Sequence, residues 1–174
     1  MGRHVAAHRT GRIQFLGADL REAGWWADYE EAFALVVSAT ALHWLSADGL
    51  RDVYGRVCAA LRPGGWFLNS DHMGSEDPAT QAQYRELLEA ERQAAFRESG
   101  ALHWDAFWDE LSRELRRPDL QELRNEADYW DGSDDGETRR AHLATLRECG
   151  FQRVEVLWQH LGEAIIAAQR RRRG

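Results

Sequence analysis

Histidine and aspartate side chains follow two apolar segments of this sequence, where they could act on a bound molecule. His43 and Trp44 come shortly after the run "FALVVSA". Asp71 ends the run "WFLNSD", and His72 follows it. A histidine side chain exchanges protons or donates hydrogen bonds near neutral pH. We therefore predict a substrate pocket in which His43 is a general base or hydrogen-bond donor and Trp44 is a wall. Asp71 and His72 would lie close to the reacting molecule.

Each of these side chains also has a purely structural interpretation, which the sequence leaves open. His43 and Trp44 would pack where a helix begins at the end of a sheet, and Asp71 and His72 would form a solvated strand end. The seven histidines and two cysteines show no spacing typical of metal ligands, so no metal site is predicted.

The segments around these residues predict a strand, a helix and a second strand. Residues 33–39 form a short β-branched run, typical of a strand that is buried on both faces. An amphipathic helix follows, with Ser46 as its N-cap and residues 63–65 (Pro-Gly-Gly) ending it. Residues 66–71 read as the next strand. Such a unit implies parallel strands, and ligands of parallel sheets bind beyond the carboxyl ends of the strands.

A further short strand is predicted before this unit. In "RIQFLGADL", Ile13 and Phe15 alternate with polar residues, and the run breaks near Asp19. Because the carboxyl ends of parallel strands share one edge of a sheet, Asp19, the segment 39–44 and Asp71 would lie together.

The rest of the chain predicts a helical segment and a C-terminal hairpin. Residues 72–137 are charged and rich in aromatic residues, and Trp104 and Trp108 share one helix face, which favours core packing over a ligand cage. A helix ending at Gly150 precedes two alternating strands joined near Gly162. Strands joined by so short a turn must be antiparallel.

The composition limits the classes of protein that this chain can represent. Its 174 residues suit one domain, and the net charge of -7 argues against a nucleic-acid binder. All 22 basic residues are arginine, so Schiff-base chemistry on a lysine is excluded. No apolar run approaches the length of a membrane span, and we expect a cytoplasmic protein without membrane contact.

A parallel core that ends in an antiparallel hairpin resembles the class I S-adenosylmethionine-dependent methyltransferases. "FALVVSATALHWL" looks like their fourth strand and its exit loop, and "LRPGGWFL" looks like the turn into their fifth strand. "FLGADL" looks like their third strand, and "LRECGFQRVEV" like their last helix and sixth strand. The resemblance implies an α/β fold with an incomplete Rossmann-like sheet, mostly parallel, within one domain (1–174) that carries residues 72–137 as a helical lid or insert.

The same resemblance implies a cofactor, S-adenosylmethionine, and the residues that bind it. Asp19 would reach the adenine amino group, and the backbone N–H of Leu20 would meet a ring nitrogen. Small residues let the chain pass close to the methionine part of the cofactor; these are Ser38, Ala39 and Thr40. The implied reaction is in-line methyl transfer to a small-molecule acceptor.

The sequence departs from the family pattern in two ways. Ala34 stands where the family has an aspartate, and the acid followed by G-x-G-x-G is missing. The chain looks like the C-terminal two-thirds of a methyltransferase domain. Two alternatives therefore stay open: a non-catalytic remnant or interaction module without a working cofactor site, and a sequence that begins too late at Met1.

The missing part also leaves open how the sheet is completed. In the family, the first and second strands lie between the third and the fourth, so their loss exposes two apolar edges. The third and fourth strands would pair directly, a protein partner or a second copy would complete the sheet, or residues 1–32 would be poorly fixed.

Overall fold

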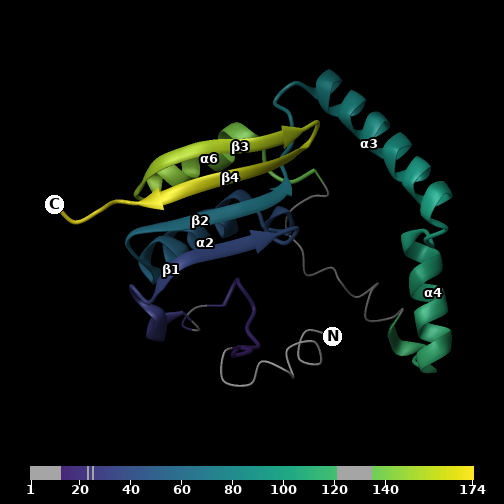
Figure 1. The fold of residues 1–174 in the computed structure, drawn as a ribbon, viewed down its shortest axis with the longest axis horizontal. Coiled ribbons are helices and arrows are strands. Elements are labelled where there is room, and N and C mark those ends of the chain that lie inside the picture. Colours follow the sequence, from purple (N-terminus) through teal and green to yellow (C-terminus); the bar gives the residue numbers. More distant parts are fainter. Residues whose placement is uncertain (1–12, 23, 25, 121–134) are drawn as a thin grey trace.

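The structure is a computed structural model that describes residues 13–22, 24, 26–120 and 135–174. It contains a single sheet with helices on one face and a helical arm at one end (Figure 1). In chain order, its elements are η2 (Ala27–Tyr29), β1 (Phe33–Ala39), η3 (Leu42–Trp44), α2 (Ala47–Ala60), β2 (Leu61–His72), α3 (Pro78–Ser99), α4 (Trp104–Leu115), α6 (Arg139–Glu148), β3 (Phe151–His160) and β4 (Glu163–Arg170).

The sheet has the strand order β1-β2-β4-β3. β1 and β2 are parallel and joined through α2, while β4 pairs antiparallel with both β2 and β3. The predicted α/β class, the strand-helix-strand unit and the C-terminal hairpin are thereby confirmed. β1 and β2 both end at the side of the sheet beyond which α3 and α4 lie (Figure 1).

The core lies between the sheet and the helices α2 and α6. Ser46 caps α2 as predicted, since its hydroxyl oxygen accepts a hydrogen bond from the Gly49 amide at 3.3 Å. The helical spacing of the apolar residues of α2 turns one face onto the sheet. The largest fully buried side chains come from both layers: Tyr54, Phe67, Leu61, Leu146, Ile166, His142, Gln169 and Asn69.

The end of α2 differs from its prediction. The helix stops at Ala60, and β2 already begins at Leu61, so the Pro-Gly-Gly segment lies inside the strand. The register with β1 jumps from Phe33 opposite Leu61 to Leu35 opposite Trp66. The extra residues bulge out, and the positive φ of Gly64 (80°) accommodates them.

The strand predicted before Asp19 is not formed. Residues 13–19 have no regular secondary structure, and Ile13 and Phe15 are exposed. A strand is stable only when its backbone groups pair with a neighbour. No described strand pairs with this segment, so the alternation of apolar and polar residues has no sheet to face.

The predicted helical segment forms α3 and α4, while residues 121–134 of it lie outside the described residues. Asp77 caps α3, and Gly100, at φ 67°, ends it. Both helices extend away from the sheet (Figure 1). The prediction that Trp104 and Trp108 pack in the core is wrong for Trp104, whose side chain is 58% exposed. No sheet or helix of the core covers α4 among the described residues. In the part of the chain that the structure describes, no helix has the length and apolar character of a membrane span.

Candidate functional site

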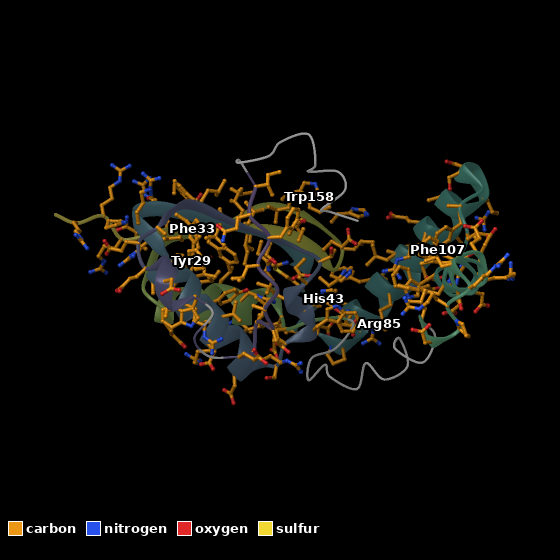
Figure 2. The ribbon with its side chains drawn as sticks, turned by 90° about the horizontal axis from the view of Figure 1, so that it is seen from below. Tyr29, Phe33, His43, Arg85, Phe107 and Trp158 are labelled. Carbon is orange, nitrogen blue, oxygen red and sulfur yellow. The ribbon has the colours of Figure 1, made fainter. Side chains whose placement is uncertain are left out.

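A buried histidine-aspartate pair lies where β1 and β2 end. His43 stands in η3, directly after β1, and Asp71 stands near the end of β2. His43 Nδ1 is 2.6 Å from Asp71 Oδ1, and both side chains are almost entirely buried. In Figure 2, His43 lies at the end of the sheet nearest Arg85 of α3, whereas Phe107 lies far out on α4.

Asp71 orders the loop that carries His43. Its Oδ2 accepts hydrogen bonds from the backbone amides of Leu42 (2.8 Å) and His43 (3.2 Å), and its Oδ1 accepts one from the His72 amide (3.0 Å). The amides of Leu42 and His43 begin a short helix, where backbone amides have no partner within the helix.

The same contacts keep Asp71 ionised. Burial raises the pKa of Asp71, but the hydrogen bonds from the His43 ring and the Leu42 amide outweigh it and hold that pKa below its ordinary value. An ionised carboxylate accepts a hydrogen bond from the Nδ1–H group of His43. The other ring nitrogen, Nε2, is then unprotonated in the neutral ring and can accept a proton or a hydrogen bond.

Other aromatic rings and one glycine close around His43. Its ring centre lies 4.5 Å from that of Trp44 and 4.7 Å from that of His72. Gly136 lies against the His72 backbone and the His43 Cβ: a Cβ atom at Gly136 would lie 2.5 Å from the His72 carbonyl oxygen and 3.0 Å from the His43 Cβ. Residues around Gly136 are tied to the end of β2 because the Gly74 amide donates to the Glu137 carbonyl oxygen at 3.1 Å.

Replacement of Gly136 by Ala is therefore expected to lower the free energy of unfolding by about 2 kcal/mol or more, from positive φ and backbone contact together. The matched control is Gly100→Ala, because Gly100 has nearly the same φ (67° against 65°) but open space at its Cβ position. Urea unfolding of both variants separates the two causes. Equal losses in both would show that the contact with His43 and His72 contributes nothing.

A cavity lies beside this pair, on the side of the predicted cofactor residues. It has a volume of about 560 Å³, within the range of small-molecule sites. Asp19, Leu20, Thr40 and Trp44 all line it, together with Ala18, Arg21, Ala41 and Leu45. Trp44 lines this cavity and its ring packs against His43, so the cavity and the buried pair are adjacent.

Thr40 and Asp19 are the unusual residues of this cavity. Thr40 has a positive φ of 45°, which is rare for a β-branched residue and is often found at functional sites. Asp19 is held by Arg21 through both carboxylate oxygens, with distances of 2.6 to 3.2 Å to the guanidinium. The hydrogen bonds from Arg21 lower the pKa of Asp19 to about 2.

The predicted site residues fall into two neighbouring groups. Asp19, Leu20 and Thr40 meet at the cavity, and His43, Trp44, Asp71 and His72 meet at the buried pair. Ser38 lines a different, apolar cavity on the α2 side of β1, and Ala39 lines neither. Sequence reasoning missed Arg21, whose spacing of two from Asp19 was a usable signal, and Gly136, for which no local signal exists. No cluster of metal ligands occurs among the described residues.

The fold is similar to part of the fold of solved methyltransferase structures. An O-methyltransferase family protein from Burkholderia thailandensis matches with a TM-score of 0.56 and 16% identity, over 99% of this chain and 40% of that chain. The methyltransferase SibL, described as S-adenosylmethionine-dependent, matches with a TM-score of 0.54 and 15% identity, over 98% and 40%.

A third similar structure is a possible exported protein from Bordetella parapertussis, with a TM-score of 0.55 and 20% identity, over 97% of this chain and 48% of that one. This chain therefore spans less than half the length of each of these proteins. No protein-family model and no curated protein sequence matches it. At these identities the similarity establishes the fold.

Proposed function

We propose that this chain carries part of the active site of an S-adenosylmethionine-dependent methyltransferase that acts on a small-molecule acceptor by in-line transfer. The buried His43–Asp71 pair, at the carboxyl ends of parallel strands in a methyltransferase-like sheet, carries this proposal. The adjoining cavity at Asp19 and Thr40 supports it, because methyl transfer needs donor and acceptor side by side.

The residues of the pair have distinct roles in this proposal. His43 uses Nε2 to accept a proton from the acceptor molecule or to hydrogen-bond with it. Asp71 fixes the ring and its tautomer through Nδ1. Trp44 forms the wall between the acceptor and the cofactor cavity. Methyl transfer depends mainly on alignment, so the rigid fixing of His43 matters more than its basicity.

Asp19, Leu20 and Thr40 line one cavity, and in this proposal they would hold the adenine end of S-adenosylmethionine. No described residue replaces the glycine-rich loop at the methionine end. When bound, the cofactor would supply the methyl group on its sulfonium.

Two observations favour a small acceptor. A cavity of about 460 Å³ reaches His72 from the α3 side, with Arg85 and Asp135 in its wall. The net charge of -7 disfavours nucleic acid. The cytoplasmic location and the absence of membrane contact stay predictions, as does the division into one domain with residues 72–137 as a lid.

Calorimetric titration with S-adenosylhomocysteine tests the cofactor half of the proposal. We expect micromolar binding that weakens when Asp19 is replaced by Ala, since the adenine amino group loses its acceptor. Arg21→Ala should strengthen binding ~2–5-fold, because Asp19 no longer has to leave its ion pair.

His43→Gln is the matched control for this titration. His43 is assigned to the acceptor side, so this variant should bind S-adenosylhomocysteine as the wild type does. A folded wild-type chain that shows no binding would contradict the proposal that this chain alone binds the cofactor.

The second candidate is a non-catalytic methyltransferase-like module. The ion pair of Asp19 with Arg21 favours it, because that pair occupies the carboxylate on which the adenine would depend. Absence of binding in the titration, also for Arg21→Ala, would support this candidate.

A further inference from the structure

The edge strand β1 lacks the features that protect exposed strands. It ends the sheet, and no described strand lies beyond it (Figure 1). Its sequence, FALVVSA, has no charged residue and no proline. Leu35 and Val37 are 49% and 63% exposed. Such a strand is typical of a sheet interior, and as an exposed edge it is a template for another strand.

The opposite edge of the sheet is built differently. β3 carries Arg153 and Glu155, and its register with β4 is irregular at two places. Charges and bulges of this kind prevent pairing with a further strand. Pairing is therefore favoured at β1 and disfavoured at β3.

The surface next to β1 is also apolar. A cavity of about 430 Å³ lies along its α2 side, lined by Leu16, Tyr29, Phe33, Val36 and Val57 among others. This cavity adds apolar surface beside the free edge of β1. The free edge and the apolar cavity adjoin, so one partner would cover both.

We infer that the partner is a second copy of this chain, with the two β1 strands paired antiparallel about a twofold axis at Val36. In this register, Leu35 of one copy lies opposite Val37 of the other, and Phe33 lies opposite Ala39. Larger side chains thus meet smaller ones on the exposed face. Closed twofold dimers are the commonest assemblies of identical chains.

Charge does not oppose this pairing. The strand is neutral, so no like charges face each other across the twofold axis. Glu31, just before β1, is already paired within its own chain with Arg170 (3.0 Å) and Arg173 (2.6 Å). In the antiparallel register, each Glu31 lies at the far end of the partner strand from the other Glu31. A parallel pairing would bring the two together.

Analytical ultracentrifugation of the full chain, from micromolar to submillimolar concentration, tests this inference. We expect a species of twice the 19.9 kDa mass of one chain. Leu35→Lys with Val37→Lys should yield only monomer, whereas the matched control Leu157→Lys, at a 58% exposed position of β3, should leave the dimer intact. Circular dichroism confirms that both variants are folded. A monomeric wild type, an assembly beyond the dimer, or equal disruption by Leu157→Lys would overturn the inference.

Cysteine cross-linking tests the register separately. With Cys58 and Cys149 replaced by Ala, the variant with Leu35→Cys and Val37→Cys should form an intermolecular disulfide on oxidation. Directly opposite residues lie about 4.5–5.5 Å apart between Cα atoms, which suits a disulfide. Val37→Cys alone should cross-link much less, and equal cross-linking would overturn the antiparallel register.

Discussion

Replacement of Asp71 by Ala is expected to lower the free energy of unfolding by about 3–5 kcal/mol, the usual effect of removing one partner of a buried charged pair. The Asp71 carboxylate accepts hydrogen bonds from the His43 ring and from the amides of Leu42, His43 and His72. Without it, these donors are buried beside an apolar methyl group and lose their partners. Urea unfolding followed by tryptophan fluorescence measures the loss.

The pH dependence of Asp71→Asn provides an independent check. The pKa of Asp71 is lower in the folded chain than in the unfolded chain. Its contribution to stability is therefore present above the unfolded pKa of about 3.9 and is lost as the pH falls from there through the folded pKa. Asp71→Asn should remove the loss of stability that protonation of Asp71 causes at acidic pH.

The exposed residue Asp28 supplies the control for both Asp71 variants. Asp28→Asn should leave the free energy of unfolding close to that of the wild type. A loss below about 1 kcal/mol for Asp71→Ala would show that water replaces the carboxylate and that Asp71 does not fix His43.

The fold could be predicted wherever a local pattern and the tertiary structure agree. The apolar run of β1 and the amphipathic face of α2 each specify one element. The beginning of β2 could not be predicted, because Pro63 and the following glycines are typical of a turn. In the folded chain they form a bulge that depends on pairing with β1. Residues 13–19 have the pattern of a strand, but no described strand lies beside them with which they could pair.

The site was predictable as a location and less so as an arrangement. Strand ends meet at one edge of a parallel sheet, which places His43 near Asp71 although 28 positions separate them in the chain. The use of Asp71 as an acceptor for the backbone of Leu42 and His43 depends on the register of β1 with β2, and so does its burial. The contact of Gly136 with His43 comes from a distant segment and leaves no local pattern.

The second large effect is expected from His142, which lies on α6 against the sheet. Its side chain is only 1% exposed, and Nδ1 is hydrogen-bonded to the Tyr54 hydroxyl group at 2.6 Å. Burial lowers the pKa of His142 to about 4, although the nearby charge of Asp71 acts in the opposite direction. The folded chain thus holds this imidazole neutral at pH values at which the unfolded chain protonates it.

The sign of the pH dependence follows from this difference. Between pH 6.5 and about 4, the unfolded state binds a proton at His142 that the folded state does not bind, so stability falls as the pH falls through this interval. A pKa difference of this size corresponds to about 3 kcal/mol. Below about pH 4 both states are protonated, and His142 contributes no further loss. This interval lies above the one in which Asp71 acts, so the two contributions can be measured separately.

His142→Gln should remove the loss between pH 6.5 and 4, because glutamine keeps a polar side chain for Tyr54 but does not titrate. Urea unfolding at several pH values in this interval measures the change for the variant and the wild type. His160→Gln is the matched control, since His160 is exposed and pairs with Glu91 at the surface. If His142→Gln loses as much stability as the wild type on acidification, His142 is protonated in the folded chain and the core around Tyr54 admits water.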